Sequence, residues 1–266
     1  MWNGETTVPL VLTRDDREIL TGNRLKVVVA QAKFPPIHAL NSPQGVAGFQ
    51  EVIRDRYPIS EERSRQVTLR MSSAGVESDA AQPGPWRFLT EDGAWIVALS
   101  ADSLSLETTS YRAYEDFRRR AAELFLLVAE VIRPARLERF GMRFLNELAL
   151  PGVSTLADWR PYLGEDLLGL GRSGELSDHV TFALQQLNLE LDDGKIIFKH
   201  GYVPRAGNED APSVYVIDID TFDDRPAPFE KEGILSRMDT YNVWAWSLFR
   251  ANVRDELVEQ LRAQAR

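Results

Sequence analysis

The order of predicted elements repeats along this chain, and the repetition constrains the fold more than any other feature of the sequence. Over about residues 24–133 the patterns predict a strand, a helix, an antiparallel meander and a long helix. A similar order recurs over about residues 137–263. Consecutive hairpins give antiparallel sheets with helices on one face. The sequence therefore predicts an α+β fold built from duplicated β-α-β(3-4)-α units in a mainly antiparallel sheet.

Proline, glycine and helix-capping residues set the expected boundaries of the helices and strands. In the first part we expect a strand ending before Pro35-Pro36, a helix beginning after Ser42, a loop over residues 72–85 and a long helix over residues 111–133. In the second part the expected strands are 137–148, 180–191, 195–203 and 214–221, followed by one helix over residues 236–263. Asp-Gly pairs at 92–93 and 193–194 indicate hairpin turns.

These boundaries suggest an extension over residues 1–23 and two related halves, 24–134 and 135–266, within one compact domain. The nearest known architecture is the duplicated saddle of the TATA-box-binding-protein class, a comparison of topology that carries no function. Two arrangements fit the pattern. The halves could share one continuous sheet, or each could pack separately.

The amino-acid composition excludes or disfavours several classes of protein function. The chain contains no cysteine, which excludes disulfides and thiol chemistry. Its net charge of −9 argues against indiscriminate nucleic-acid binding, although a local basic patch could override the total. The first residues show neither a basic nor an apolar run, and no stretch approaches the roughly 20 apolar residues of a membrane span. We expect a cytoplasmic protein.

Three segments resemble landmarks of a sporadically distributed, largely uncharacterised prokaryotic protein family: VAQAKFPP at Val29–Pro36, RFGMRFLN at Arg139–Asn146 and VIDIDT at Val216–Thr221. With the terminal helix, the resemblance covers most of the chain in order. The family brings no assigned activity or catalytic residues to carry over. Its patchy distribution implies mobile genes, such as antiviral defence or toxin–antitoxin loci.

Two aspartates on one strand are the best candidates for a metal site. Asp218 and Asp220 are two residues apart, so a strand directs both carboxylates to one face and Ile217 and Ile219 to the other. Such a pair could hold Mg²⁺ or Mn²⁺, which prefer oxygen ligands. The competing interpretation is that both face solvent or pair with arginines of a neighbouring strand.

Arg139 and Arg143 are predicted to share one face of the strand at 137–148, opposite an apolar face that includes Asn146. Their guanidinium groups could bind phosphate, or they could form a cross-strand ion-pair ladder with Asp218 and Asp220. On the final helix, Trp246 falls away from the apolar stripe. It could be an exposed anchor for a protein partner or part of the core beneath the preceding loop.

Three further motifs are weaker candidates for a functional site. The glycines of residues 169–174 follow a helix and precede a strand, the reverse of a dinucleotide-binding loop. His200 could serve as a general base, but an exposed strand histidine is the expected outcome. The run Arg118-Arg119-Arg120 reads as a solvated helix face, with nucleic-acid binding as the alternative.

The leading hypothesis is a non-enzymatic recognition or scaffold protein that binds a protein partner in a small bacterial complex through Trp246, Arg139 and Arg143, without a cofactor. The alternative is a metal-dependent phosphoryl or phosphodiester hydrolase, or a nucleotide-sensing domain. That alternative uses Asp218 and Asp220 for Mg²⁺ or Mn²⁺ and Arg139 and Arg143 for phosphate.

Overall fold

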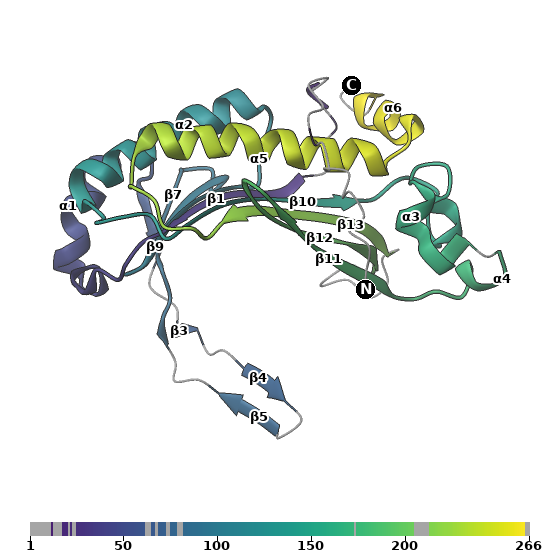
Figure 1. The fold of residues 1–266 in the computed structure, drawn as a ribbon, viewed down its shortest axis with the longest axis horizontal. Coiled ribbons are helices and arrows are strands. Elements are labelled where there is room, and N and C mark those ends of the chain that lie inside the picture. Colours follow the sequence, from purple (N-terminus) through teal and green to yellow (C-terminus); the bar gives the residue numbers. More distant parts are fainter. Residues whose placement is uncertain are drawn as a thin grey trace, which may run out of the picture. The chain divides into compact units, whose positions relative to one another are not determined.

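The fold is α+β, as predicted, with one nine-stranded antiparallel sheet accompanied by helices (Figure 1). The computed structural model describes residues 12, 18–20, 22, 25–61, 65–66, 69–72, 75–78, 82–172, 174–204 and 213–263. No helix in these ranges is both long and apolar enough to cross a bilayer.

The strand order contains the predicted duplication. Hydrogen-bonded neighbours follow the order β11-β12-β13-β10-β1-β9-β8-β7-β2. In each half, the first strand pairs with the last strand of the meander that follows it. The first half therefore has the order β1-β9-β8-β7 and the second half has the order β10-β13-β12-β11. Strand β2 is an additional strand beside β7. The strands are β1 (Leu25–Lys33), β2 (Ile59–Glu61), β7 (Trp86–Leu89), β8 (Trp95–Leu99), β9 (Ser103–Thr108), β10 (Arg139–Leu148), β11 (Ala183–Leu191), β12 (Gly194–Val203) and β13 (Val214–Asp223).

Contacts divide the chain into two compact units whose boundaries differ from the halves expected from the sequence. Unit 2 comprises residues 25–145 and 222–238, and unit 1 comprises residues 1–24, 146–221 and 239–266. The boundaries differ because β10, β13 and the long helix α5 (Lys231–Asn252) each continue from one unit into the other.

Unit 2 packs helices on one face of its strands. Along β1, Val28, Ala30 and Ala32 are fully buried and alternate with partly exposed residues, as expected for a sheet covered on one side. Helix α1 (Pro43–Ile53) begins as predicted, because the Ser42 side chain accepts a hydrogen bond from the Gly45 N–H. Helix α2 (Tyr114–Leu127) packs Phe117 against the Trp95 ring, with centroids 5.9 Å apart.

Unit 1 contains several short helices besides its strands: η3 (Ala157–Trp159), α3 (Glu165–Leu168), η4 (Gly169–Arg172), α4 (Gly174–Ser177) and α6 (Asp255–Ala263). Trp159 is completely buried, and its ring centroid lies 5.6 Å from that of Tyr215 on β13. Asn146 lies on the buried face of β10, where its amide donates to the Ile217 carbonyl at 3.2 Å. The hydrogen bond expected for a buried asparagine is therefore present.

Each of the two predicted long helices is divided into two segments. The long helix of residues 111–133 consists of α2 and a π-helical segment, η2 (Val128–Ile132), which ends at Arg133 in the left-handed region. The final helix is two helices, α5 and α6. The helix is interrupted between them because Val253 forms a β-bridge with Leu163 and the Arg254 N–H donates to the Tyr162 carbonyl at 2.9 Å.

The loop predicted over residues 72–85 contains strands instead. Strand β4 (Leu69–Ser72) pairs with β5 (Gly75–Ser78), and β3 (Arg65–Gln66) pairs with β6 (Gln82–Pro83), in two ribbons separate from the nine-stranded sheet. Backbone pairing needs no alternation of apolar side chains, so the composition of this segment did not reveal it.

Candidate functional site

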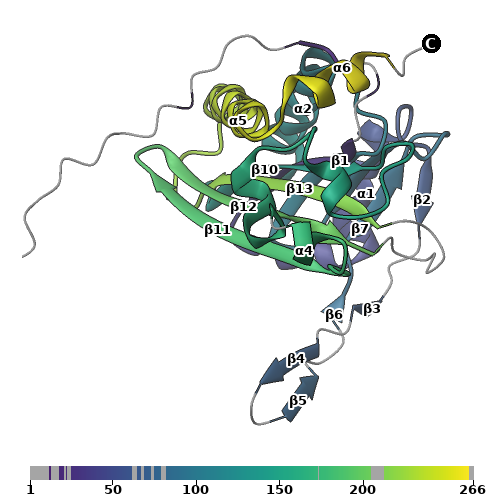
Figure 2. The ribbon, with the colours of Figure 1, turned by 90° about the vertical axis from the view of Figure 1, so that its right-hand side faces the viewer.

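Strand β11 ends the order of described strands and exposes most of its length. Only Ala183, Leu189 and Leu191 are partly covered, and the other six residues are exposed. Figure 2 shows β11 as the outermost arrow beside β12. An edge strand of nine residues is long for a sheet of this kind, and its outward backbone groups offer a template for another strand.

The pairing of β11 with β12 is continuous from Ala183↔Tyr202 to Leu191↔Gly194. Residues that close a two-residue turn form a hydrogen-bonded pair, and such pairs alternate along the strands. Odd-numbered residues of β11 therefore direct their N–H and C=O groups toward β12. The even-numbered residues direct theirs outward: Leu184, Gln186, Asn188 and Glu190.

Gly201 permits the close approach of β11 at the start of this ladder. A Cβ atom built on Gly201 would lie 2.1 Å from the Ala183 carbonyl oxygen and 2.9 Å from the Leu184 Cα. Both are backbone atoms of β11, so they cannot move without displacing the strand. The absence of a side chain at Gly201 therefore allows β11 to approach β12 at this end of the ladder.

Exposed apolar residues occur on β11 and in the chain just before it. Four large hydrophobic residues in the segment from α4 through β11 have 41–59% of their surface exposed: Leu176, Phe182, Leu184 and Leu187. The only charged residue of β11 is Glu190, which lies opposite Lys195 of β12. The strand contains no lysine, proline or bulge, the features with which natural proteins protect their edges.

The corresponding strand of the first half is covered. In the series 1-9-8-7, strand β7 occupies the place that β11 has in 10-13-12-11, and β2 pairs with it in antiparallel register. Arg87 of β7 donates to Glu61 of β2 at 2.8 Å, across the register pair. In the second half, the chain before β11 forms α3, η4 and α4 instead of a covering strand.

The structure places the predicted metal ligands on β13, and Ile217 and Ile219 are buried as expected. Asp218 is buried too, at 6% exposure, so it does not face solvent, which was one of the two interpretations offered for it; Asp220 is half-buried. Among the described residues, no group of three or more histidine, aspartate or glutamate side chains is arranged to hold a metal ion. The assignment of Mg²⁺ or Mn²⁺ to Asp218 and Asp220 stays a prediction.

Asp223, further along β13, has two arginine partners. Arg225 donates to both of its carboxylate oxygens, at 2.9 and 3.1 Å, and Arg237 lies 3.6 Å away. Burial alone would raise the pKa of Asp223, but the hydrogen bonds and charge of Arg225, helped by Arg237, hold that pKa below its ordinary value. This carboxylate therefore ties the end of β13 to the segment that follows it.

The predicted partner-binding residues occupy different environments. Arg139 is half-buried, and its guanidinium lies 4.2 Å above the Phe222 ring, whereas Arg143 is exposed on the same strand. Trp246 is half-buried on α5, with its ring centroid 6.1 Å from that of Phe249. It therefore lies between the two alternatives predicted for it.

His200 is buried, which corrects the prediction of an exposed strand histidine. The Tyr215 hydroxyl donates to the Leu167 carbonyl at 2.8 Å, so it must accept from His200 Nδ1, which lies 2.9 Å away. Burial lowers the pKa of His200 below its ordinary value. The residue supports β12 from its buried face, a role that the sequence did not reveal because Tyr215 and Leu167 are distant in the chain.

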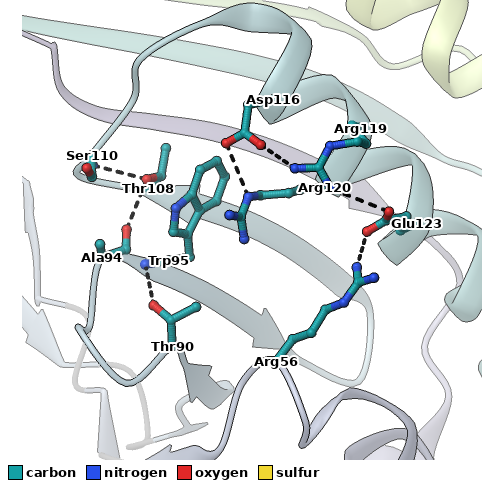
Figure 3. Close-up of polar contacts among 10 residues, drawn as sticks. All are labelled: Arg56, Thr90, Ala94, Trp95, Thr108, Ser110, Asp116, Arg119, Arg120 and Glu123. Atoms are coloured by element: carbon teal, nitrogen blue, oxygen red, sulfur yellow. Dashed lines mark hydrogen bonds and ion pairs between the residues drawn. The ribbon is translucent and has the colours of Figure 1, made fainter.

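Two members of the run Arg118-Arg119-Arg120, Arg119 and Arg120, belong to an ion-pair network (Figure 3). Arg119 and Arg120 both pair with Asp116, and the Arg120 guanidinium lies 4.3 Å above the Trp95 ring. Glu123 pairs with Arg119 and with Arg56, which follows α1. Because these cations have intramolecular partners, the network favours a structural role over phosphate binding.

Comparison with known protein families and with curated proteins finds no match for this chain. The β11 edge was missed in the sequence because edge position depends on which strands pair, and no local pattern encodes that. A signal was nevertheless present: the stretch ALQQLNLEL lacks the lysine or proline with which natural proteins usually protect an edge strand.

Proposed function

We propose that this chain is a non-enzymatic recognition protein that binds an extended segment of a protein partner by strand addition at β11. The observation that carries the proposal is the difference between the two meanders. The first adds β2 to its outermost strand, and the second leaves the equivalent strand, β11, exposed.

Main-chain hydrogen bonds would supply much of the affinity. The outward backbone groups of Leu184, Gln186, Asn188 and Glu190 are spaced to pair with an antiparallel strand, as β7 pairs with β2. Side chains would add selectivity, because a partner strand covering this edge removes Leu184 and Leu187 from water. A partner with alternating apolar residues fits this arrangement best.

The proposal is tested with two substitutions of Asn188, proline and alanine, of which only proline lacks the backbone N–H. Asn188→Pro removes an outward N–H while leaving the pairing with β12 intact, since proline is tolerated at such edge positions. Asn188→Ala keeps the N–H and loses only the side chain, which accepts from Gln186 Nε2 at 2.9 Å. We expect partner recovery in affinity purification from the native host to fall at least tenfold for Asn188→Pro and to stay unchanged for Asn188→Ala.

Equal recovery by wild type and both variants would contradict strand addition at β11. The residues predicted from the sequence, Trp246, Arg139 and Arg143, provide a second surface for the same experiment. If their alanine variants abolish recovery and Asn188→Pro does not, the partner binds there instead. The setting in a mobile defence or toxin–antitoxin locus stays an expectation from the family resemblance.

A further inference from the structure

We infer that a second copy of this chain can occupy the β11 edge, so that two β11 strands pair in antiparallel register about a two-fold axis at Leu187. This inference rests on the proposed strand addition and names its partner. The argument combines the length of the edge, its charge pattern and the direction of its backbone groups.

The sequence of β11 is self-complementary in this register. Leu187 faces Leu187 of the second copy, Gln186 faces Asn188, and Leu184 faces Glu190. All nine residues of the strand overlap, over a length of about 30 Å. Residues that face each other lie on the same side of the sheet. Leu187 faces its copy, Leu189 faces Gln185 and Leu191 faces Ala183, so the leucines of the two copies adjoin at Leu187.

The charges permit the pairing. Glu190 is the only charged residue of the strand, and its counterpart in the second copy lies six residues away along the ladder, roughly 20 Å. That separation exceeds the Debye length of about 8 Å at physiological salt, so the two carboxylates repel each other weakly. The opposite edge of the sheet differs, since β2 has three residues, follows Pro58 and ends in Glu61.

The backbone geometry defines the class of the central pair. Leu187 directs its N–H and C=O groups toward β12, so it would face its copy as a non-hydrogen-bonded pair. Side chains approach most closely in such pairs. The even-numbered residues on either side would form the hydrogen bonds between the copies.

The test uses charge at the two-fold position, measured as solution mass by light scattering. We expect wild type to have twice the mass of one chain, and Leu187→Lys and Leu187→Glu each to have the mass of one chain, because like charges then face each other. An equimolar mixture of the two variants should recover the double mass. Val52→Lys, at an exposed position on α1, is the matched control and should keep the wild-type mass.

A cross-link tests the register directly. Because the chain has no cysteine, Leu187→Cys introduces a single thiol, which should form an intermolecular disulfide on mild oxidation. Val52→Cys should remain unlinked under the same conditions. An unlinked Leu187→Cys chain whose mass is still double would overturn the register.

Three results separate the inference from the function on which it rests. A single-chain mass for wild type, with partner recovery still abolished by Asn188→Pro, overturns the second copy and leaves strand addition intact. A single-chain mass with recovery unaffected by Asn188→Pro overturns both. A double mass that persists in Leu187→Lys assigns the dimer to another surface and overturns the inference.

Discussion

The two meanders of this protein have the same strand order but differ at their outermost strands. In the first, β7 has β2 as a neighbour, and the Arg87–Glu61 ion pair connects them. In the second, β11 is as long as the central strand β1 and exposes six of its nine residues. The comparison shows that the two halves keep the same internal pairing while only one of them has a further described strand beside its outermost meander strand.

The largest effect should come from the glycine beneath β11. Gly201→Val places a side chain against the Ala183 carbonyl, and we expect a loss of about 1–3 kcal/mol in the free energy of unfolding, as for overpacked sites. Urea denaturation measures the loss, and hydrogen exchange should localise it to β11 and β12.

Gly48→Ala in α1 is the matched control in the first half. Apart from the backbone of its own helix turn and its chain neighbours, no atom lies within 4 Å of the added Cβ, and alanine favours the helix, so stability should rise by about 0.5–1 kcal/mol. If Gly201→Val were as well tolerated, the close approach of β11 to β12 would not depend on the glycine.

Acid should loosen the second meander before the first. The pKa of His200 is lower in the folded state than its ordinary value of 6.5, so below pH 6.5 the unfolded chain binds more protons. Stability is thus complete above pH 6.5 and is lost as the pH falls toward the folded-state pKa, with a slope of at most about 1.4 kcal/mol per pH unit for one proton.

Hydrogen exchange at pH 7 and pH 5.5 measures this difference. Amides of β11 and β12 should lose more protection than those of β7 and β8, and His200→Gln should remove most of the pH dependence in this window. Equal loss in both meanders would assign the effect to other groups.

The smallest effect should come from the strand that covers β7. Glu61→Lys replaces the partly exposed pair with Arg87 by two like charges, at a cost of about 0.5–1 kcal/mol. We expect faster exchange at β7 and no change in partner recovery. Lost partner recovery in this variant would mean that the two edges are not functionally distinct.

Several features of the fold could be predicted from the sequence because they depend on neighbours in the chain. Ser42 and Pro43 defined the start of α1, and alternation assigned Ile217 and Ile219 to the buried face of β13. The break at Val253 was missed, since its cause is a bridge to Leu163, which is 90 residues distant in sequence. The burial of His200 was missed for the same reason.

By itself, the sequence determined the order of the main sheet strands and long helices, the Asp-Gly turns and the apolar faces of β10 and β13, because side-chain periodicity and backbone preference act over a few residues. Only the tertiary structure decided which strands are neighbours. That β7 has β2 beside it while β11 has no described strand on its outer side follows from pairing between distant segments, and that difference defines the proposed recognition edge.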